Sequence, residues 1–323
     1  MILSFAPLEG VTYSPYRRLH ARFFPGADRY FAPFLAPDGQ GRVKASALRE
    51  LEPDANRGCC LVPQILCSCA EAFLPLSREL AAMGYTELNL NAGCPSGTVV
   101  PKHKGAGMLL DLRSLDLFLD RVFSGTDLRV SVKTRLGVES PEEFPAVLAL
   151  LNRYPISELI LHARDRRGLY RSVPDLGAFA AAFAASRAPV CYNGNILSPA
   201  HARQVLSRVP ALDRMMAGRG AVADPALFRR LRGGPPLEQE ELSDFLAALL
   251  SAYLDSGIGE YHALGRMKEL WYYVNHKFPG CQRELKALNK ARSLADYRDA
   301  AAAFFSSGRF DPEAAFPGPF PQG

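Results

Sequence analysis

The sequence predicts an α/β fold, a parallel (β/α)8 TIM barrel that is followed by a small C-terminal all-α domain. Eight short apolar segments, each typical of a buried strand, recur between Ile2 and Ala217. Helix-length amphipathic segments separate most of them, as a closed parallel barrel requires. After Glu238 only helical patterns follow. We therefore expect a barrel over residues 1–232, a helical domain over 233–310 and a flexible, proline-rich tail over 311–323.

The expected elements follow one another in a regular order. The eight expected strands cover residues 2–6, 29–34, 60–65, 87–91, 129–134, 158–162, 189–193 and 213–217. The helices expected around them cover residues 14–24, 71–83, 112–123, 141–152, 176–185 and 198–207, several of which begin at Ser, Asp or Pro. Residues 36–57 have mostly the pattern of a loop. Beyond the barrel, helices are expected over residues 238–256, 261–278, 282–290 and 294–306.

The composition is that of an ordinary globular protein, with 48% apolar and 22% charged residues. The sequence has no run of 18 apolar residues, and its start lacks the features of a signal peptide, so we expect a cytoplasmic monomer that does not contact membranes. The seven cysteines predict reduced thiols. Cys59, Cys60, Cys67 and Cys69 lack the Cys-x2-Cys spacing of zinc sites, so no metal is expected.

Polar residues follow the apolar strands at the ends where a parallel barrel carries its chemistry. These residues are Pro7, Glu9, Gln64, Asn89, Asn91, Cys94, Lys133, Arg135, His162, Arg164, Asn193, Asn195, Gly218 and Arg219. Some polar residues at strand ends are only turn formers, as the pair Asn193-Gly194 could be. Lys133 and Gln64 are not turn formers, and they therefore favour a ligand in the barrel mouth.

The stretch of residues 87–95 places a thiol just past the fourth expected strand. Leu88 and Leu90 alternate with Asn89 and Asn91, and Gly93-Cys94-Pro95 then ends the strand. This motif alone supports two interpretations equally. Cys94 can be a reactive residue at the barrel mouth, or a small buried hydrophobic residue, as most free cysteines are.

Two segments after the last strands suit a phosphate group. Gly218 and Gly220 allow close backbone approach, and a short helix expected near Asp224 would offer free N–H groups to an anion. Barrels often bind phosphate after strands seven and eight, where residues 193–195 and 218–219 fall. We expect a phosphorylated ligand, although the Gly-Arg-Gly sequence could also be a simple turn.

The net charge of +5 is modest, so a polyanionic partner would have to bind a local basic patch. The helical region contains such a patch. Seven Lys or Arg residues lie between Arg266 and Arg292, against two glutamates. Trp271, Tyr272, Tyr273 and His276 lie among them, and aromatic residues between cations are suited to stacking on unpaired bases. The alternatives are that Trp271 is a core residue and that the basic surface is only solvated.

Seven motifs in this order resemble the tRNA-dihydrouridine synthase family over nearly the whole chain. The motifs are residues 6–12 (APLEGVT), 62–64 (VPQ), 89–95 (NLNAGCP) with 105–110 (GAGMLL), 132–137 (VKTRLG), 161–164 (LHAR), 193–196 (NGNI) and 217–220 (AGRG). The resemblance implies a barrel that holds FMN and a helical domain that binds tRNA. It also implies the reduction of specific uridines to 5,6-dihydrouridine with NADPH.

The resemblance also implies a role for each motif residue. Pro7, Leu8, Glu9, Gln64, Lys133 and His162 would contact the flavin, and Asn193, Gly194, Asn195, Gly218 and Arg219 would hold its phosphate. Cys94 would protonate C5 of the uracil after hydride transfer to C6, and cysteine thiols are mostly protonated at neutral pH. Asn91 and Arg164 would contact the uracil, while Lys286 and Lys290 would contact the tRNA backbone. Leu8 stands where Met is usual and Asn195 where Asp is common, and residues 101–104 form an unusually basic loop.

Three other functions remain open at this point. An FMN barrel could reduce a free pyrimidine, but the basic helices would then have no role. A dihydrouridine synthase could act on ribosomal RNA, which would meet the same basic surface. A phosphate-binding barrel could bind RNA without any chemistry. The position of the modified uridine does not follow from the sequence.

Overall fold

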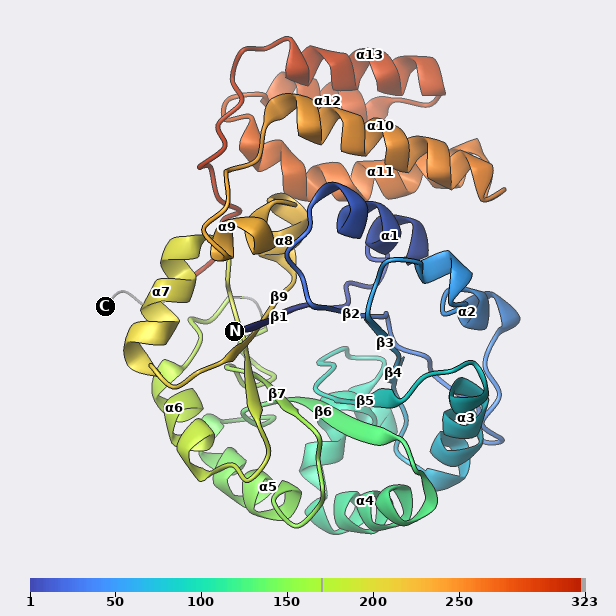
Figure 1. Cartoon of the computed structure of the whole chain (residues 1–323), viewed down its shortest axis with the longest axis vertical. Helices are drawn as coiled ribbons and strands as arrows, with labels where there is room; N and C mark the ends of the chain where they lie inside the picture. Colours follow the sequence, from blue (N-terminus) through green and yellow to red (C-terminus); the bar gives the residue numbers. More distant parts are fainter. Residues whose placement is uncertain (170, 321–323) are drawn as a thin grey trace.

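The computed structural model describes residues 1–169 and 171–320, and in them nine parallel strands form a nearly closed barrel (Figure 1). The strands are β1 (Ile2–Phe5), β2 (Arg29–Phe31), β3 (Leu61–Val62), β4 (Gln64–Ile65), β5 (Glu87–Ala92), β6 (Arg129–Arg135), β7 (Leu159–His162), β8 (Val190–Asn193) and β9 (Arg214–Ala217). They pair in the order β3-β2-β1-β9-β8-β7-β6-β5-β4. The expected TIM-type barrel is thereby confirmed.

The third expected strand is divided at Pro63, which explains the additional strand. A proline has no N–H to donate to a strand ladder, so it interrupts the pairing. Before it, β3 pairs with β2, and after it, β4 pairs with β5. The Pro63 carbonyl still accepts a hydrogen bond from the Asn89 N–H at 2.9 Å. The ring therefore closes through one short, broken strand.

Helices cover the outside of the barrel, close to where the sequence predicts them. They are α1 (Ser14–Phe23), α3 (Ala70–Ala82), α4 (Leu112–Gly125), α5 (Phe144–Leu151), α6 (Leu176–Ala185) and α7 (Pro199–Arg208). Side chains at their starts accept backbone N–H groups, as Asp111 does for α4 and Ser198 does for α7. The region expected as a loop contains the short α2 (Ala45–Arg49) and the 3-10 turn η1 (Asp54–Asn56).

Two short helices follow β9. The helix α8 (Arg219–Ala223) begins directly after β9 and ends at Asp224, and α9 (Leu227–Leu231) follows. The start of α9 lies three residues after Asp224, close to where the sequence predicts a short helix, whereas α8 was not predicted. Pro225 cannot continue α8, and the Asp224 carboxylate is buried in ion pairs with Arg230 and Lys277.

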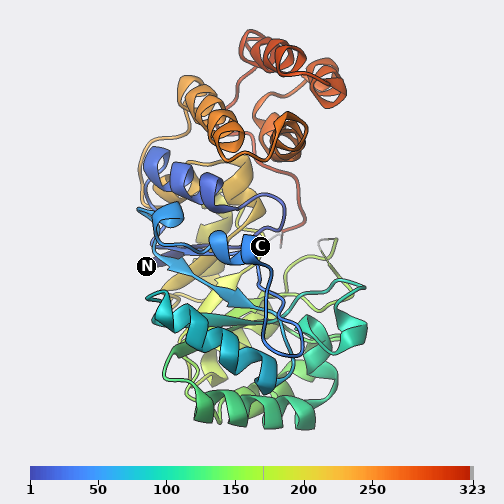
Figure 2. The same cartoon turned by 90° about the vertical axis from the view of Figure 1, so that its right-hand side faces the viewer.

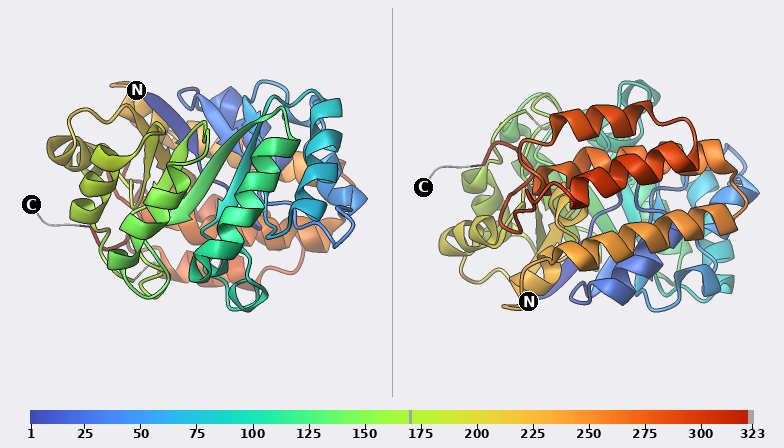
Figure 3. Two further views of the ribbon diagram at one scale, coloured as in Figure 1. Left: turned by 90° about the horizontal axis from the view of Figure 1, so that it is seen from below. Right: turned by 90° about the horizontal axis from the view of Figure 1, so that it is seen from above.

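Four helices pack on one side of the barrel: α10 (Gln239–Asp255), α11 (Glu260–Val274), α12 (Gln282–Lys290) and α13 (Leu294–Phe305). Figures 2 and 3 show α10 and α11 next to the barrel and α12 and α13 farther out. Trp271 is fully buried among them, where its Nε1 donates to the Tyr297 hydroxyl at 2.9 Å. It is a core residue and is not exposed for base stacking. No helix in the described part of the chain is long and apolar enough to cross a membrane.

A buried ion pair connects these helices to the barrel. Asp224 follows α8, and its carboxylate lies 3.1 Å from the Nζ of Lys277, whose side chain is 1% exposed. Arg230 of α9 contacts the same carboxylate at 2.5 Å. Lys277 also donates to the Pro312 carbonyl at 2.6 Å. Residues 311–320 thus begin on this pair, and they pack against the barrel mouth. The rest of the expected tail, residues 321–323, lies outside the described residues.

We expect Asp224→Asn to lower the free energy of unfolding by about 3–5 kcal/mol, because it leaves the Lys277 ammonium buried without its carboxylate. The double variant Asp224→Asn with Lys277→Met should show a smaller decrease in the free energy of unfolding, since no unpaired charge then remains at position 277. Urea denaturation measures both. Asp54→Asn, which removes an exposed pair with Arg57, is the control and should leave the midpoint unchanged. An unchanged midpoint in Asp224→Asn would contradict this role for the pair.

Candidate active site

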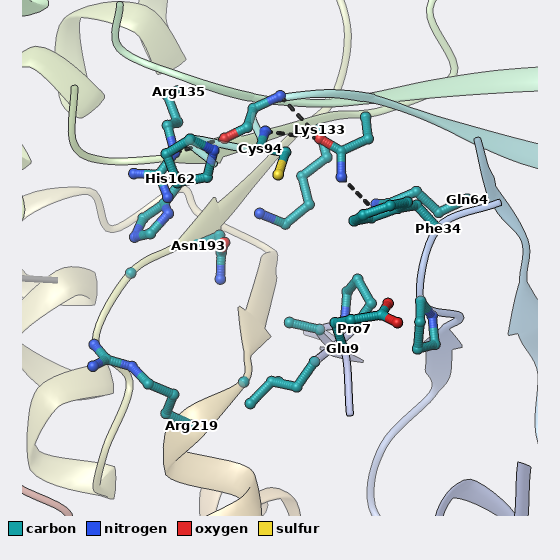
Figure 4. A pocket seen from close by; sticks show the side chains of 18 of the residues that line it. Pro7, Glu9, Phe34, Gln64, Cys94, Lys133, Arg135, His162, Asn193 and Arg219 are labelled. Carbon is teal, nitrogen blue, oxygen red and sulfur yellow. Dashed lines mark hydrogen bonds between the residues drawn. The ribbon is translucent and has the colours of Figure 1, made fainter. Parts of the chain in front are cut away.

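A cavity of about 310 Å³ opens at the C-terminal ends of the strands (Figure 4). Every residue that the resemblance assigns to the flavin lines it, namely Pro7, Leu8, Glu9, Gln64, Lys133, His162, Asn193, Gly194, Asn195, Gly218 and Arg219. Asn91 and Cys94 line it as well. Residues spread over more than 200 positions of the sequence thus meet in one place, because the parallel strands all end on the same side of the barrel.

A chain of amide side chains fixes the wall of the cavity at β4 and β5. The Nε2 of Gln64 donates to the Oδ1 of Asn89 at 2.7 Å, and the Nδ2 of Asn91 donates to the Oε1 of Gln64 at 2.7 Å. The Nδ2 of Asn89 donates to the hydroxyl of Ser131 on β6 at 3.0 Å. Because each amide orients the next, the carboxamide of Gln64 presents a defined pattern of donor and acceptor to the cavity.

Asn91 also holds the loop that carries Cys94. Its Oδ1 accepts the N–H of Gly93 at 3.1 Å and that of Cys94 at 2.9 Å, as in a turn capped by an asparagine side chain. Both ends of the Asn91 carboxamide are thus engaged within the protein. The resemblance suggested that this residue contacts the uracil, and the structure adds hydrogen bonds by which it positions Cys94.

Gly105 supports Cys94 from the other side. The backbone of Gly105 has a φ of +57°, and a Cβ built on it would lie 2.8 Å from the Cys94 Cβ. The next N–H, of Ala106, donates to the Cys94 carbonyl at 3.0 Å. The glycine-rich segment therefore packs directly behind the cysteine, and a side chain at position 105 would displace it.

Cationic side chains dominate the cavity, since Lys133, Arg135 and Arg219 line it and Glu9 carries the one carboxylate among the described lining residues. Burial and the nearby Arg135 guanidinium lower the pKa of Lys133 to about 7. In Figure 4 the Lys133 and Cys94 side chains both point into the cavity. The site is thus suited to an anionic group near Lys133, because such a group would stabilise the charged lysine.

His162 is neutral at physiological pH. Burial and the cations Arg135 and Lys133 lower its pKa well below the usual value of 6.5. The Nη1 of Arg164 lies 3.0 Å from the His162 Nε2, and an arginine can only donate, so this nitrogen is the acceptor. The neutral ring therefore carries its hydrogen on Nδ1.

Arg164 is buried behind the cavity and does not line it. Its Nε donates to the Ser172 carbonyl at 2.7 Å, and its Nη1 also lies 3.4 Å from the Asn195 Oδ1. These contacts orient His162 and Asn195 toward the cavity. The resemblance suggested that Arg164 contacts the uracil; the structure shows that the two residues it contacts, His162 and Asn195, line the cavity.

The loops after β8 and β9 form a cradle for an anion. Arg219 donates to the Asn195 Oδ1 at 2.7 Å, and the Nδ2 of Asn193 donates to the Met216 carbonyl at 3.0 Å. A Cβ on Gly220 would lie 2.1 Å from the Ile196 carbonyl oxygen, so the two loops can touch only because this residue is glycine. The glycines and the adjacent guanidinium fit a phosphate group.

Several residues of the cavity wall had no role toward a cofactor in the sequence analysis, among them Arg135, Phe34 and Tyr273. Arg135 was expected at the barrel mouth, and it lies two residues beyond Lys133 on the same strand, so the strand period agrees with its place on the inward face. Its Nε donates to the Gly93 carbonyl at 2.7 Å. Phe34, at the end of the second expected strand, also offered such a signal. Tyr273 comes from α11, and only the packing of the helices brings it to the barrel.

Lys286 and Lys290 are exposed on α12 and do not line the cavity. Other basic residues of the expected patch are engaged within the protein. Lys277 is buried, Arg266 lies 4.2 Å above the Tyr13 ring, and Lys268 donates to the Ala291 carbonyl. The basic surface is therefore smaller than the charge count of the sequence suggested, and α12 carries its outer part.

Comparison with known proteins finds one family that matches nearly the whole chain. The profile of a family described as "Dihydrouridine synthase (Dus)" matches residues 4–302. The "Probable tRNA-dihydrouridine synthase" of Rhodobacter capsulatus is 29% identical over 310 residues, which is 91% of this chain and 93% of that protein. The "tRNA-dihydrouridine synthase B" of Pseudomonas aeruginosa is 29% identical over 300 residues, 88% of this chain and 86% of that protein.

Solved structures share the fold at much lower identity. A variant of NCR from Zymomonas mobilis superimposes with a TM-score of 0.53 at 15% identity, covering 74% of this chain and 88% of that one. Morphinone reductase gives a TM-score of 0.53 at 14% identity, covering 74% of this chain and 87% of that one. These similarities concern the barrel architecture alone. Because the family profile spans nearly the whole sequence, from the first strand into α13, the chain belongs to the dihydrouridine synthase family.

Proposed function

We propose that this chain reduces specific uridines of tRNA to 5,6-dihydrouridine, with FMN in the barrel cavity and NADPH as the reductant. One observation carries the proposal: the cavity joins a cysteine on a loop held by hydrogen bonds, a partly buried lysine and a cationic glycine cradle in a member of this family. The relatives named tRNA-dihydrouridine synthase span most of the chain, which supports the choice of tRNA over a free pyrimidine.

The residues present fit FMN. Pro7, Leu8 and Glu9 offer backbone groups after β1, and Gln64 offers an oriented amide to the flavin ring. Lys133 would lie at the edge of the ring that carries negative charge, and His162 is a neutral hydrogen-bonding partner beside it. The cradle of Asn193, Gly194, Asn195, Gly218 and Arg219 would hold the phosphate.

When bound, FMN would supply a hydride, received from NADPH, to C6 of the uracil. The Cys94 thiol would donate the proton that C5 requires. Asn91 and Gly105 hold the loop so that the thiol stays at the cavity wall. This division of tasks needs no acid other than Cys94. The Nε2 of neutral His162 accepts from Arg164, so this nitrogen carries no proton to donate.

The tRNA must deliver its uridine into the cavity, which requires the base to leave the folded RNA. This extrusion costs a few kcal/mol. Lys286 and Lys290 on α12 are exposed and can bind the RNA backbone outside the cavity, so the contacts there can offset this cost.

Cys94→Ala should abolish the proton transfer while FMN binding and NADPH oxidation remain, because neither step uses the thiol. We expect reoxidation of the reduced flavin by unmodified tRNA to slow by about 10²–10⁴-fold, the usual contribution of a general acid. Anaerobic stopped-flow absorbance of the flavin measures this rate. Cys60→Ala, which removes an exposed cysteine, should behave as the parental protein.

Several outcomes of this experiment would contradict the proposal. A parental rate in Cys94→Ala would mean that the proton comes from another group. Reoxidation by free uridine but not by tRNA would indicate a pyrimidine reductase, and reoxidation by ribosomal RNA alone would indicate an rRNA enzyme. A protein that takes up no FMN would indicate a barrel that only binds RNA.

Lys133 should make FMN binding depend on pH. In the free protein its pKa is about 7, and the negative flavin edge should raise it, so binding takes up a proton above pH 7. The FMN affinity should therefore fall as the pH rises from 7 to 9. Quenching of flavin fluorescence measures it, and Lys133→Met should flatten the dependence. An equally steep dependence in that variant would exclude Lys133 as the cause.

Binding of tRNA should weaken steeply as salt rises, because phosphate contacts release counterions. Replacing Lys286 and Lys290 by Ala should lower the slope of log affinity against log salt by about two, with unchanged FMN content. Filter binding across a salt series measures the slope. The matched control replaces Arg78 and Arg208, which are exposed on α3 and α7, and should keep the parental slope. A slope unaffected by the lysine changes would remove α12 from the RNA surface.

A further inference from the structure

Residues 311–320, which we call the strap, run from the helical region to the barrel mouth. The segment contains three prolines, and it is attached at its start to both parts of the protein. The Asp311 N–H donates to the Lys277 carbonyl at 2.8 Å, and the Pro312 carbonyl accepts from the Lys277 ammonium at 2.6 Å. Arg230 of α9 contacts the Glu313 carboxylate at 2.5 Å.

The middle of the strap packs behind two residues of the cavity wall. Phe316 is only 6% exposed. The Arg219 guanidinium carbon lies 5.7 Å from the centre of its ring, and the ring centroid of Tyr273 lies 5.4 Å away. Arg219 and Tyr273 both line the cavity, so Phe316 supports them from outside it.

The last described part of the strap holds the phosphate cradle itself. The Pro319 carbonyl accepts the Nδ2 of Asn195 at 2.7 Å, while the Oδ1 of Asn195 accepts from Arg219 at 2.7 Å. An aspartate at position 195 could not donate to the Pro319 carbonyl. Phe320 stacks on His201 of α7 with a centroid distance of 4.0 Å, which fixes the strap next to this bond.

We infer that the strap is a positioning element for the cofactor phosphate: it holds Asn195 and Arg219 in the arrangement that binds the anion. This inference rests on the proposed function, in which these two residues hold the phosphate of FMN. Without the strap, Arg219 would lose the Phe316 ring beside its guanidinium, and Asn195, which accepts from Arg219, would lose the Pro319 carbonyl. Any part of their order lost in this way would have to be restored when the ligand binds, which opposes binding. The strap therefore acts on the phosphate, not on the flavin ring.

Comparing FMN with riboflavin, which lacks the phosphate, tests this inference. In flavin-free protein, Phe316→Ala should weaken FMN binding by about tenfold, the equivalent of one lost contact to a charged group, and leave riboflavin binding unchanged. Phe320→Ala, at a half-exposed position that the fold tolerates more easily, should act in the same direction. Flavin fluorescence quenching gives both dissociation constants. Phe310→Ala is the control, because Phe310 packs on Phe278 in the helical region.

The outcomes separate the strap from the proposed function. If the parental protein binds FMN no better than riboflavin, the phosphate cradle is wrongly assigned and the proposed function fails. If the parental protein prefers FMN but the strap variants weaken both ligands equally, or neither, the strap is only a structural element and the inference is overturned. Thermal melting of the flavin-free variants reports any general loss of stability.

Discussion

The position of every group in the cavity depends on how the barrel closes between β2 and β5. The closing strand is broken at Pro63, and backbone pairing there is short, with β3 on one neighbour and β4 on the other. Side-chain amides extend the connection, because Gln64 is hydrogen-bonded to both Asn89 and Asn91. Since Asn91 also holds the Cys94 loop, the same bonds that close the ring place the thiol. Closure of the fold and placement of the cysteine are therefore one structural feature.

In the absence of an anion, the cationic groups of the cavity also destabilise the folded protein. Lys133 is partly buried close to Arg135, and its lowered pKa expresses the unfavourable free energy of its charged form there. His162 avoids the same problem by remaining neutral. Proteins keep such destabilising arrangements mainly at functional sites. A ligand with negative charge at the flavin edge and on the phosphate would relieve the repulsion, so the electrostatics and the proposed cofactor agree.

The sequence predicted the barrel well, and the residues it placed at the strand ends line one cavity, because both features follow from short-range patterns. Apolar strands ending in polar residues place those residues at one barrel mouth, whatever the details of packing. Hydrogen bonds between the side chains of the site were harder to predict. The resemblance assigned Asn91 and Arg164 to the uracil, and the structure adds local hydrogen bonds that engage them with Cys94 and His162. Such bonds depend on side-chain direction, which neither spacing nor residue type determines.

Long-range contacts were the least predictable. Trp271 looked equally suitable for base stacking and for the core, and the packing of α13 against α11 decides for the core. The buried ion pair of Asp224 was not predicted, because its partner Lys277 lies 53 positions later. Proline and glycine at the end of the sequence suggested flexibility, yet Phe316 finds a buried position between α8 and α11. In each case the partner is distant in the sequence, and no local signal indicates it.

The connection between the barrel and the helices has a consequence for how an RNA could reach the cavity. Tyr273 of α11 forms part of the cavity wall, and the buried pair of Asp224 and Lys277 fixes α11 against α8. The exposed lysines of α12 therefore stand at a fixed position relative to Cys94. Binding energy gained on a mobile domain would be reduced by the ordering of that domain. Because α12 is held in place, the binding energy gained there remains available to keep a base outside the RNA stack. A cavity at the bottom of a barrel mouth requires such an extruded base.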